Sequence, residues 1–556
     1  MRSKPKKEKK TLNVIRKIVV VLLFVVCVCA VINLAPNYIQ DKLANKTNVI
    51  VNNNNITRSL KKDVIVDENE TIYISFSDIK NFFDENIYYD KQYNQIITGS
   101  NTKIASLEID KKQMYINSSK VNIYSPVIEE DDTYYLPISE MENVYNVDVK
   151  YSKDSKIVTI DSLDREQKTG NSANNAGVKY KPTVFSKTID NVKKGENVVV
   201  IDQQDGWYKI RTSKGNIGYI KDVANIYTSR EKIEKKSQIE GKVSMVWDYY
   251  TRTAPTRTEK IKGINVVSPS FASVVRLGKG EIATRIGSEG QAYITWAHNN
   301  GYKVWPMISN DSLKDTTSEI LNDYKLREKL INNIMDIVLT YNVDGINIDF
   351  ENIKEADKDM YTRFIIELAP RLAEYEKVLS VDVTAPDGSP DWSLCFDRNK
   401  LAKVADYLVF MAYDQYGDSS DQAGTTAGAD WIETNLKKFV GKQEEVDPNK
   451  LILGMPFYTR LWKETSYSLT STPVYIKSVN TTLPNGVERK WDENVKQYVV
   501  EYQANGTTYK MWIEDDKSLG EKFELMHQYK LAGAAYWQKD FESSSTWDLV
   551  DEQINK

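Results

Sequence analysis

The sequence predicts an α/β fold for residues 239–556, a (β/α)8 TIM barrel. The first observation behind this is a rhythm in which short apolar, β-branched segments alternate with amphipathic stretches such as residues 325–339 and 360–372. Such alternation is typical of parallel strands covered by helices. The second is that the apolar segments number eight, at residues 242–247, 263–268, 303–308, 345–350, 378–383, 407–411, 451–455 and 533–537. An open doubly wound sheet is the alternative, but no Gly-rich phosphate loop follows the first strand.

The N-terminus combines a basic tail, residues 1–17, with a largely apolar segment, residues 18–38, that is long enough to cross a bilayer as a helix. By the positive-inside rule the tail lies in the cytoplasm and the rest of the chain outside, which predicts a single-pass protein of the cell membrane. A cleaved signal peptide is the alternative, because Val28-Cys29-Ala30 could serve as a small-residue cleavage site. The Asn-rich residues 39–60 are interpreted as a spacer.

The composition limits the chemistry of the exported part. It contains two histidines, His298 and His527, and one cysteine, Cys395, which are too few for a His/Cys metal cluster. We therefore expect no metal, no cofactor and no intrachain disulfide, and a buried packing role for Cys395. With a formal net charge of -4, the chain is expected to have no nucleic acid partner.

Residues 61–163 contain an internal repeat. The segment 71–79, Thr-Ile-Tyr-Ile-Ser-Phe-Ser-Asp-Ile, matches segment 133–141, Thr-Tyr-Tyr-Leu-Pro-Ile-Ser-Glu-Met. Each copy predicts a strand, a short helix and two further strands, and two such units can bury one shared α+β core. The repeat resembles the stalk-like domain at the N-terminus of copper amine oxidases, which implies a spacer domain of exported proteins without a copper site.

Residues 164–177 are polar and are interpreted as a linker, and residues 178–228 predict a small β-barrel of short strands and Gly or Asp turns. The segment from Asp205 to Ile220 resembles a bacterial SH3-type domain. That resemblance implies a possible wall peptide as ligand, with Trp207 and Tyr219 as contacts, although packing in the core is the stronger interpretation for Trp207. The charged residues 229–237 are interpreted as a connecting helix.

One strand of the predicted barrel carries chemistry. Residues 343–352, Val-Asp-Gly-Ile-Asn-Ile-Asp-Phe-Glu-Asn, alternate apolar and polar side chains, so that Asn347, Asp349 and Glu351 project from one face. A solvated strand edge could carry the same alternation, but its other face would rarely be so uniformly β-branched and aromatic. Because barrel active sites lie at the C-terminal ends of the strands, Asp349 and Glu351 are candidate site residues.

This strand, read as Asp344-Gly345-x-Asn347-x-Asp349-x-Glu351, resembles the D-G-x-D-x-D-x-E signature on the fourth barrel strand of glycoside hydrolase family 18. Three further segments resemble motifs of the family in the same order. They are Met411-Ala-Tyr-Asp414 after the sixth strand, Gly454-Met-Pro-Phe-Tyr-Thr-Arg-Leu-Trp462 at the seventh and Ala535-Tyr-Trp537 at the eighth. The four motifs span the whole barrel region, so the resemblance implies a glycosidase.

The family is an exception to the rule of two catalytic carboxylates, because the acetamido group of its substrate supplies the nucleophile. The resemblance implies that Glu351 protonates the leaving glycosidic oxygen, while Asp349 and Tyr413 hold the acetamido group. Trp537 is implied as the floor under the sugar ring, with core packing as the alternative for both aromatic residues. The other implied substrate-binding residues are Asn347, Asp414, Tyr458 and Arg460, of which Asp414 and Arg460 could instead form a structural ion pair.

Asn347 departs from the signature, which has aspartate at this position. An amide can hydrogen-bond Asp349 but cannot share a proton with it as a second carboxyl group does, so we expect a less elevated pKa for Asp349 than in the usual pair. Asparagine at this position resembles the branch of the family that contains spore-cortex N-acetylglucosaminidases. The substitution therefore does not predict an inactive enzyme.

Residues 463–522 are too many for a loop between the seventh and eighth strands and predict a small α+β insertion. The expected function is hydrolysis of an N-acetylglucosamine polymer. The anchor, stalk and SH3-type domain favour peptidoglycan of the cell wall as the substrate. Chitin or chitooligosaccharides are one alternative, and a catalytically inactive, lectin-like wall-binding protein is another.

Overall fold

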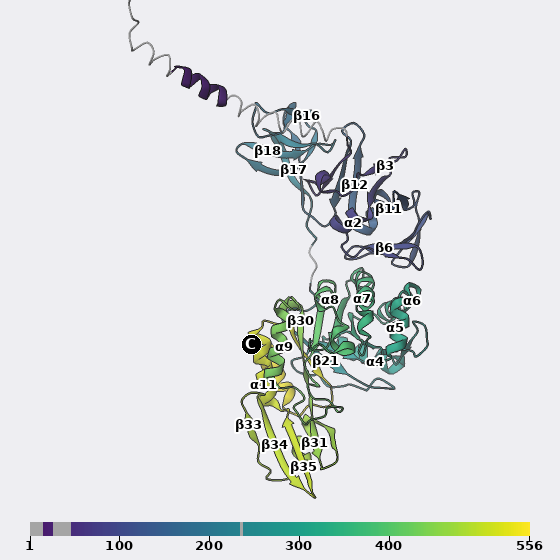
Figure 1. The fold of residues 1–556 in the computed structure, drawn as a ribbon, viewed down its shortest axis with the longest axis vertical. Helices are drawn as coiled ribbons and strands as arrows, with labels where there is room; N and C mark the ends of the chain where they lie inside the picture. Colours follow the sequence, from purple (N-terminus) through teal and green to yellow (C-terminus); the bar gives the residue numbers. More distant parts are fainter. Residues whose placement is uncertain (1–14, 26–45, 234–236) are drawn as a thin grey trace, which may run out of the picture. The chain divides into compact units, whose positions relative to one another are not determined.

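The structure is a computed structural model that describes residues 15–25, 46–233 and 237–556 (Figure 1). The chain divides near residue 236 into two compact units. Residues 15–25 are helical, and the remainder of the predicted membrane segment, residues 26–38, lies outside the described residues. Among the described residues, no helix has both the length and the apolar character needed to cross a bilayer.

The first half of the N-terminal unit has the repeated order that the sequence predicts. In one copy β4 (Ile72–Ser75) leads into α2 (Phe76–Phe82), β5 (Tyr88–Asp90) and β6 (Gln95–Gly99). In the other β11 (Thr133–Pro137) leads into α3 (Glu142–Tyr145), β12 (Val147–Ser152) and β13 (Ile157–Ser162). Apolar side chains of both copies, among them Ile74, Ile79, Leu136 and Val144, share one buried core. The remaining strands are β2 (Asn54–Asn55), β3 (Ile65–Val66), β7 (Ile104–Glu108), β8 (Gln113–Ile116), β9 (Ser119–Asn122) and β10 (Ile128–Glu130).

Two predicted boundaries in this unit are wrong. The spacer prediction for residues 39–60 fails at β1 (Asn48–Val51), which pairs in parallel with β13 and so belongs to the stalk sheet. The linker prediction for residues 164–177 fails because β14 (Gln167–Ser172) pairs with two strands of the SH3-type sheet. β1 is short and stands among Asn-rich residues, although Val49 and Ile50 are buried in the stalk core. β14, Gln-Lys-Thr-Gly-Asn-Ser, has the polar composition of a loop.

The SH3-type domain is one sheet of short antiparallel strands: β14, β15 (Ala176–Lys179), β16 (Thr188–Val192), β17 (Asn197–Gln204), β18 (Trp207–Arg211), β19 (Ile217–Ile220) and β20 (Val223–Arg230). The predicted helix at 229–237 is wrong at its start, since Ser229 and Arg230 end β20. Trp207 is 9% exposed, with the Lys221 ammonium 5.5 Å from its ring centroid, which agrees with a packing role.

The C-terminal unit is a closed parallel barrel. Its strands follow one another in the order β26, β27, β28, β29, β30, β36, β21 and β22, all in parallel. Closure comes from the second and third strands, because β22 (Val266–Pro269) pairs with β25 (Lys303–Val304) and β23 (Ala272–Val274) pairs with β26 (Met307–Ser309). The predicted (β/α)8 barrel is therefore confirmed.

The barrel strands match their predictions closely except where proline intervenes. The other strands are β21 (Val243–Asp248), β27 (Gly345–Asp349), β28 (Val378–Val383), β29 (Tyr407–Met411), β30 (Leu451–Pro456) and β36 (Gly533–Trp537). The predicted strand 303–308 is split at Trp305-Pro306, since proline has no N–H to donate to the ladder. The second strand begins later than predicted, at Val266, and is interrupted after Pro269; the short β24 (Ile282–Thr284) pairs with β23.

Amphipathic helices surround the strands and bury their apolar faces in one continuous core, which includes Leu330, Ile334, Phe364 and Leu368. They are α4 (Gly287–Asn299), α5 (Lys314–Asn322), α6 (Tyr324–Tyr341), α7 (Lys358–Ala373), α8 (Arg398–Val404), α9 (Ala429–Val440), α11 (Asp516–Gln528) and α12 (Thr546–Gln553). Residues 249–265, between β21 and β22, contain no helix. Cys395 is fully buried, as predicted.

The insertion is a small antiparallel sheet that leaves the barrel after β30 (Figure 1). It comprises β31 (Tyr458–Glu464), β32 (Leu469–Tyr475), α10 (Val479–Thr482), β33 (Lys490–Asp492), β34 (Gln497–Ala504) and β35 (Thr507–Ile513). It thus begins and ends earlier than the predicted 463–522. Residues 516–522 belong to α11, because Leu519 is buried in the barrel core.

Candidate active site

The strand β27 delivers the first site residues to the C-terminal end of the barrel. Its first residue must be glycine, because a Cβ at Gly345 would lie 2.6 Å from the Val378 carbonyl oxygen. Asp349 ends the strand, and Glu351 follows two residues later on the same face. Asn310 fixes the Glu351 backbone from both sides, since its Oδ1 accepts the Glu351 N–H at 3.0 Å and its Nδ2 donates to the Glu351 carbonyl at 2.8 Å.

Asn347 is fully buried at the centre of a polar network inside the barrel. Its Oδ1 accepts from Trp247 Nε1 at 2.9 Å, which fixes the amide orientation. Its Nδ2 donates to Ser380 Oγ at 3.1 Å and to Asp382 Oδ1 at 2.7 Å. An amide at this position can hydrogen-bond Asp349, but in the structure the Asn347 amide donates to Asp382 on the neighbouring strand.

Asp349 and Asp382 form a buried acidic pair. Burial raises the pKa of Asp349 well above its ordinary value, and the negative charges of Glu351 and Asp382 raise it further. Burial likewise raises the pKa of Asp382 well above its ordinary value, against the lowering effect of the Asn347 hydrogen bond. The expectation that the pKa of Asp349 is less elevated than in the usual pair considers Asn347 alone, whereas the carboxyl group of Asp382 is a second acid that raises this pKa.

Glu351 has the protonation behaviour of a general acid. Burial raises the pKa of Glu351 to about 7, with a further contribution from the negative charge of Asp414. At neutral pH a large fraction of the Glu351 carboxyl groups therefore holds a proton, while the group still lies at the open end of the strand. A carboxyl group poised near the working pH is the usual condition for proton transfer to a leaving group.

Aromatic side chains on the barrel strands β21 and β36, and in the segments that follow β21, β29 and β30, lie near these acids. The ring centroid of Trp247 lies 5.7 Å from that of Trp537 and 6.5 Å from that of Tyr413. Tyr413 also lies 6.3 Å from Tyr458, and Trp537 lies 5.7 Å from the half-exposed Tyr249. Burial beside Asp382 and Asp349 raises the pKa of Tyr413 well above its ordinary value, so its hydroxyl stays protonated and can donate a hydrogen bond.

Asp414, Tyr458 and Arg460 form a second polar group next to Glu351. The Tyr458 hydroxyl donates to Asp414 Oδ1 at 2.6 Å, and an Arg460 guanidinium nitrogen lies 3.9 Å from the same oxygen. Asp414 has a positive φ of 55° and is half exposed, so its other oxygen is open to a ligand. The ion pair and substrate binding are therefore compatible interpretations, because the contact with Arg460 holds the Asp414 carboxylate in place for a contact with the substrate.

The structure brings all the predicted site residues to one end of the barrel, and it adds others. Trp247, Asn310, Ser380 and Asp382 contact the predicted residues directly but were not among the candidates. Asp382 could have been found, because an aspartate inside the apolar segment 378–383 is unusual for a buried parallel strand. The role of Asn310 depends on a loop conformation that has no sequence signature.

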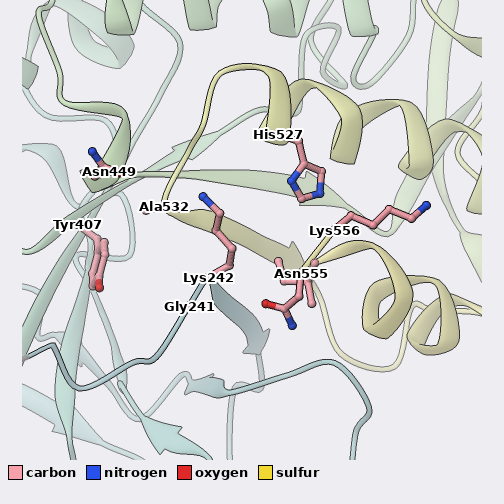
Figure 2. A pocket seen from close by; sticks show the side chains of 9 residues that line it. Gly241, Lys242, Tyr407, Asn449, His527, Ala532, Asn555 and Lys556 are labelled. Atoms are coloured by element: carbon pink, nitrogen blue, oxygen red, sulfur yellow. The ribbon is translucent and has the colours of Figure 1, made fainter.

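A separate cavity of about 460 Å³ lies at the opposite end of the barrel (Figure 2). Its lining includes Lys242, Tyr407, Asn449 and Ala532, which precede or begin barrel strands. In barrel enzymes the N-terminal end of the strands contributes to stability, and the chemistry takes place at the C-terminal end.

Among the described residues, no group of His, Cys, Asp and Glu side chains has an arrangement suited to a metal ion.

The comparisons with known proteins agree with this architecture. The matching family models are Glycosyl hydrolases family 18 over residues 245–542, Copper amine oxidase N-terminal domain over 50–160 and Bacterial SH3 domain over 175–224. An uncharacterized glycosylase, YvbX, from Bacillus subtilis (strain 168) is 27% identical over 48% of this chain and 79% of its own length. A cortical fragment-lytic enzyme from the same organism is 26% identical over 45% of this chain and 58% of its own length.

Among solved structures, the spore cortex-lytic enzyme SleL of Bacillus cereus superposes with a TM-score of 0.50 and 18% identity. The superposition covers 66% of this chain and 90% of that one, and it supports the fold.

A closed barrel with a carboxyl group of raised pKa beside aromatic side chains, at the C-terminal ends of its strands, is the arrangement expected of a barrel glycosidase. The chain belongs to glycosyl hydrolases family 18, whose model covers more than half of its residues. Within the chain, the family 18 domain is preceded by a copper amine oxidase N-terminal domain and a bacterial SH3 domain. The protein is thus a glycosidase related to spore cortex-lytic enzymes and chitinases.

Proposed function

We propose that the protein is a membrane-anchored, extracytoplasmic glycosidase that cleaves the N-acetylglucosamine-containing glycan of the cell wall, peptidoglycan, with retention of configuration. The observation that carries the proposal is the buried Glu351 carboxyl group, with a pKa of about 7, beside Asp349 and Tyr413. This arrangement holds a proton for the leaving group and places polar partners where a sugar acetamido group can lie.

The reaction proceeds in two steps. Glu351 donates its proton to the glycosidic oxygen while the acetamido carbonyl oxygen attacks the anomeric carbon, so that one C–O bond breaks and another forms. Asp349 accepts a hydrogen bond from the acetamido N–H and stabilises the positive charge of the oxazolinium ion. Tyr413 hydrogen-bonds the same acetamido group. Water then attacks the anomeric carbon, the bond from that carbon to the acetamido oxygen breaks, and Glu351 takes up a proton from the attacking water.

The sugar lies on Trp537, which packs against Trp247 and Tyr249 and so offers a rigid apolar floor. Asn347 acts from below by fixing Asp382 and Trp247. Asp414, Tyr458 and Arg460 bind neighbouring sugars at the mouth of the site. No step in this mechanism needs a metal ion or a cofactor.

Peptidoglycan is favoured over chitin by the architecture of the chain. A basic tail and an apolar segment at the N-terminus, followed by stalk and SH3 domains, suit a protein that works between a membrane and a surrounding wall. One relative is named a cortical fragment-lytic enzyme, while other relatives are named chitinases. The SH3 domain is proposed to hold a wall peptide by its exposed loops, since Trp207 itself is packed.

The test is hydrolysis by the full chain of purified peptidoglycan and of chitin oligomers, with identification of the new reducing ends by mass spectrometry. We expect N-acetylglucosamine reducing ends from peptidoglycan and slower cleavage of chitin. The variant Glu351→Gln serves as the matched control and should be inactive on both. Faster cleavage of chitin than of peptidoglycan would overturn the proposed substrate preference. Binding without cleavage by the natural sequence would indicate a lectin-like protein.

A further inference from the structure

Two buried carboxyl groups on adjacent strands lie next to each other below the proposed reacting acetamido group. In the register of β27 and β28, Asn347 lies opposite Ser380 and Ile348 opposite Val381, so Asp349 and Asp382 occupy the next positions. Neighbouring strands are spaced by about 4.8 Å. Asn347 contacts both Ser380 and Asp382, so these side chains point to the barrel interior, as does Asp349, two residues after Asn347.

Each of these carboxyl groups has an oxygen without a partner. Among the described residues, Asp349 Oδ1 and Asp382 Oδ2 are both shielded from solvent and accept no hydrogen bond. A buried ionised oxygen without a donor is costly, and one proton held between the two oxygens would satisfy both. The other Asp382 oxygen is already used, because it accepts from Asn347 at 2.7 Å.

Among the described residues, no positive charge near the pair can compensate two ionised carboxylates, so a shared proton is the way to reduce their charge. The groups that face Asp382 and Asp349 are Asn347 on β27, Glu351 and Asp311 in the loops above, Trp247 on β21, Tyr413 after β29 and Tyr361 on α7. These groups are acids or neutral donors, so none of them balances two buried negative charges. Two like charges in one buried site cannot both ionise readily.

We propose that Asp382 is a positioning residue: held by Asn347, its carboxyl group shares one proton with that of Asp349 and thereby sets the charge and orientation of Asp349. The proposal rests on the substrate-assisted function proposed above and adds a residue from the fifth strand to it. As positive charge develops on the acetamido group, the proton moves to Asp382 Oδ2 and leaves Asp349 ionised. It returns when the product leaves, so the number of protons is unchanged.

The arrangement gives a physical role to Asn347. An amide cannot hold the shared proton. Because Asn347 Oδ1 accepts from Trp247 Nε1, the amide presents an N–H to Asp382 Oδ1, and Asp382 Oδ2 is directed away from Asn347. The acidic partner of Asp349 is thus Asp382 on the neighbouring strand. Asn347, which precedes Asp349 by two residues on the same strand, supports Asp382 by its hydrogen bond.

The test compares the full chain with Asp382→Asn and with the paired variant Asn347→Asp/Asp382→Asn, which restores one carboxyl group beside Asp349. Asp406→Asn is the matched control, because Asp406 accepts the Leu379 N–H at the opposite end of β28. We expect D382N to lower kcat by about 10- to 100-fold with little change in KM, and the paired variant to recover part of the loss. D406N should retain its activity.

The pH dependence distinguishes positioning from simple packing. Because Asp382 raises the pKa of Asp349, its loss should move the acidic limb of the kcat profile to lower pH. A loss of activity that is equal at all pH values, with no recovery in the paired variant, would overturn the proposal. If D382N does not fold, the paired variant carries the test, and a folded but inactive paired variant overturns it.

A second measurement does not depend on activity. The folded state holds the Asp382 proton more tightly than the unfolded chain, so the natural protein loses stability as pH rises above about 4, where an unfolded aspartate ionises. The Tm of D382N relative to the natural chain should therefore increase with pH, and a constant difference would contradict the shared proton. If the natural chain cleaves no N-acetylglucosamine polymer, the proposed function fails, and this measurement still decides the state of Asp382.

Discussion

At the residue scale, the chemistry depends on where carboxyl groups are buried. Glu351, Asp349 and Asp382 all lie in surroundings that favour the protonated form, and each of these burials costs stability at neutral pH. The proposed mechanism needs a proton donor and an orienting acceptor in the same small space, which accounts for these acids. The site residues are therefore expected to be less than optimal for folding.

Glu351→Gln should make the protein more stable at high pH while abolishing catalysis. Because the folded protein raises the pKa of Glu351 from 4.5 to about 7, stability is lost as pH rises through this interval. The amide removes that loss, so the variant should exceed the natural chain by roughly 3 kcal/mol above pH 7 and match it below pH 4.5. Thermal unfolding at a series of pH values measures this, and a variant that is less stable at pH 8 would contradict the assigned burial of charge.

Asp414→Asn should shift the basic limb of the pH profile. The negative charge of Asp414 helps raise the pKa of Glu351. In the proposed mechanism the active form of Glu351 is the protonated one. Activity is present below about pH 7 and lost above it, so removing the charge should move that loss to lower pH. The profile of kcat on a soluble oligosaccharide reports it. Asp418→Asn, an exposed change in the same loop, should leave the limb in place.

At the element scale, the barrel could be predicted because its signals are local. The apolar strands and amphipathic helices each carry their own period, and β28, β29 and β36 were predicted with the bounds that the structure has. The family motifs placed Glu351, Tyr413 and Trp537 in one site. What could not be predicted depends on contacts between distant segments, such as β1 with β13, the split at Pro306 and the bond from Asn347 to Asp382.

Asn310→Ala should misplace Glu351 without dismantling the barrel. Asn310 is buried and satisfies both the N–H and the carbonyl of Glu351, so its loss leaves backbone groups unpaired at a cost of about 1–3 kcal/mol. A shift of the acid from its productive position should lower kcat by roughly 100-fold. Kinetics and thermal unfolding of this variant should be compared with Thr317→Ala, which removes only the contact between Asn310 and Thr317 and should remain active.

At the scale of the whole molecule, the candidate active site lies within one of the two compact units. All the site residues belong to the C-terminal unit, whereas the stalk and SH3 domains form the N-terminal unit. Within the N-terminal unit these two domains are joined by a buried ion pair, in which an Arg211 guanidinium nitrogen donates to Asp161 Oδ1 at 2.8 Å. The stalk and SH3 domains are thus in direct contact within the N-terminal unit.

Removal of residues 46–233 should leave hydrolysis of short soluble oligosaccharides unchanged and reduce hydrolysis of intact wall sacculi. The physical reason is that a second binding module raises the local concentration of polymer but does not contact the reacting bond. Turnover of both substrates should be measured side by side. A tenfold loss on the soluble substrate would show instead that the N-terminal unit contributes to the catalytic site.

In the proposed mechanism the substrate's acetamido group is the nucleophile, and fluorination of that group changes its nucleophilicity without changing the protein. Chromogenic N-acetylglucosaminides with acetyl, fluoroacetyl, difluoroacetyl and trifluoroacetyl groups differ in the nucleophilicity of the carbonyl oxygen. We predict that kcat/KM of the natural chain falls steeply along the series, by roughly 100-fold from acetyl to trifluoroacetyl. Rates that stay level across the series would mean instead that a carboxylate of the protein attacks the anomeric carbon.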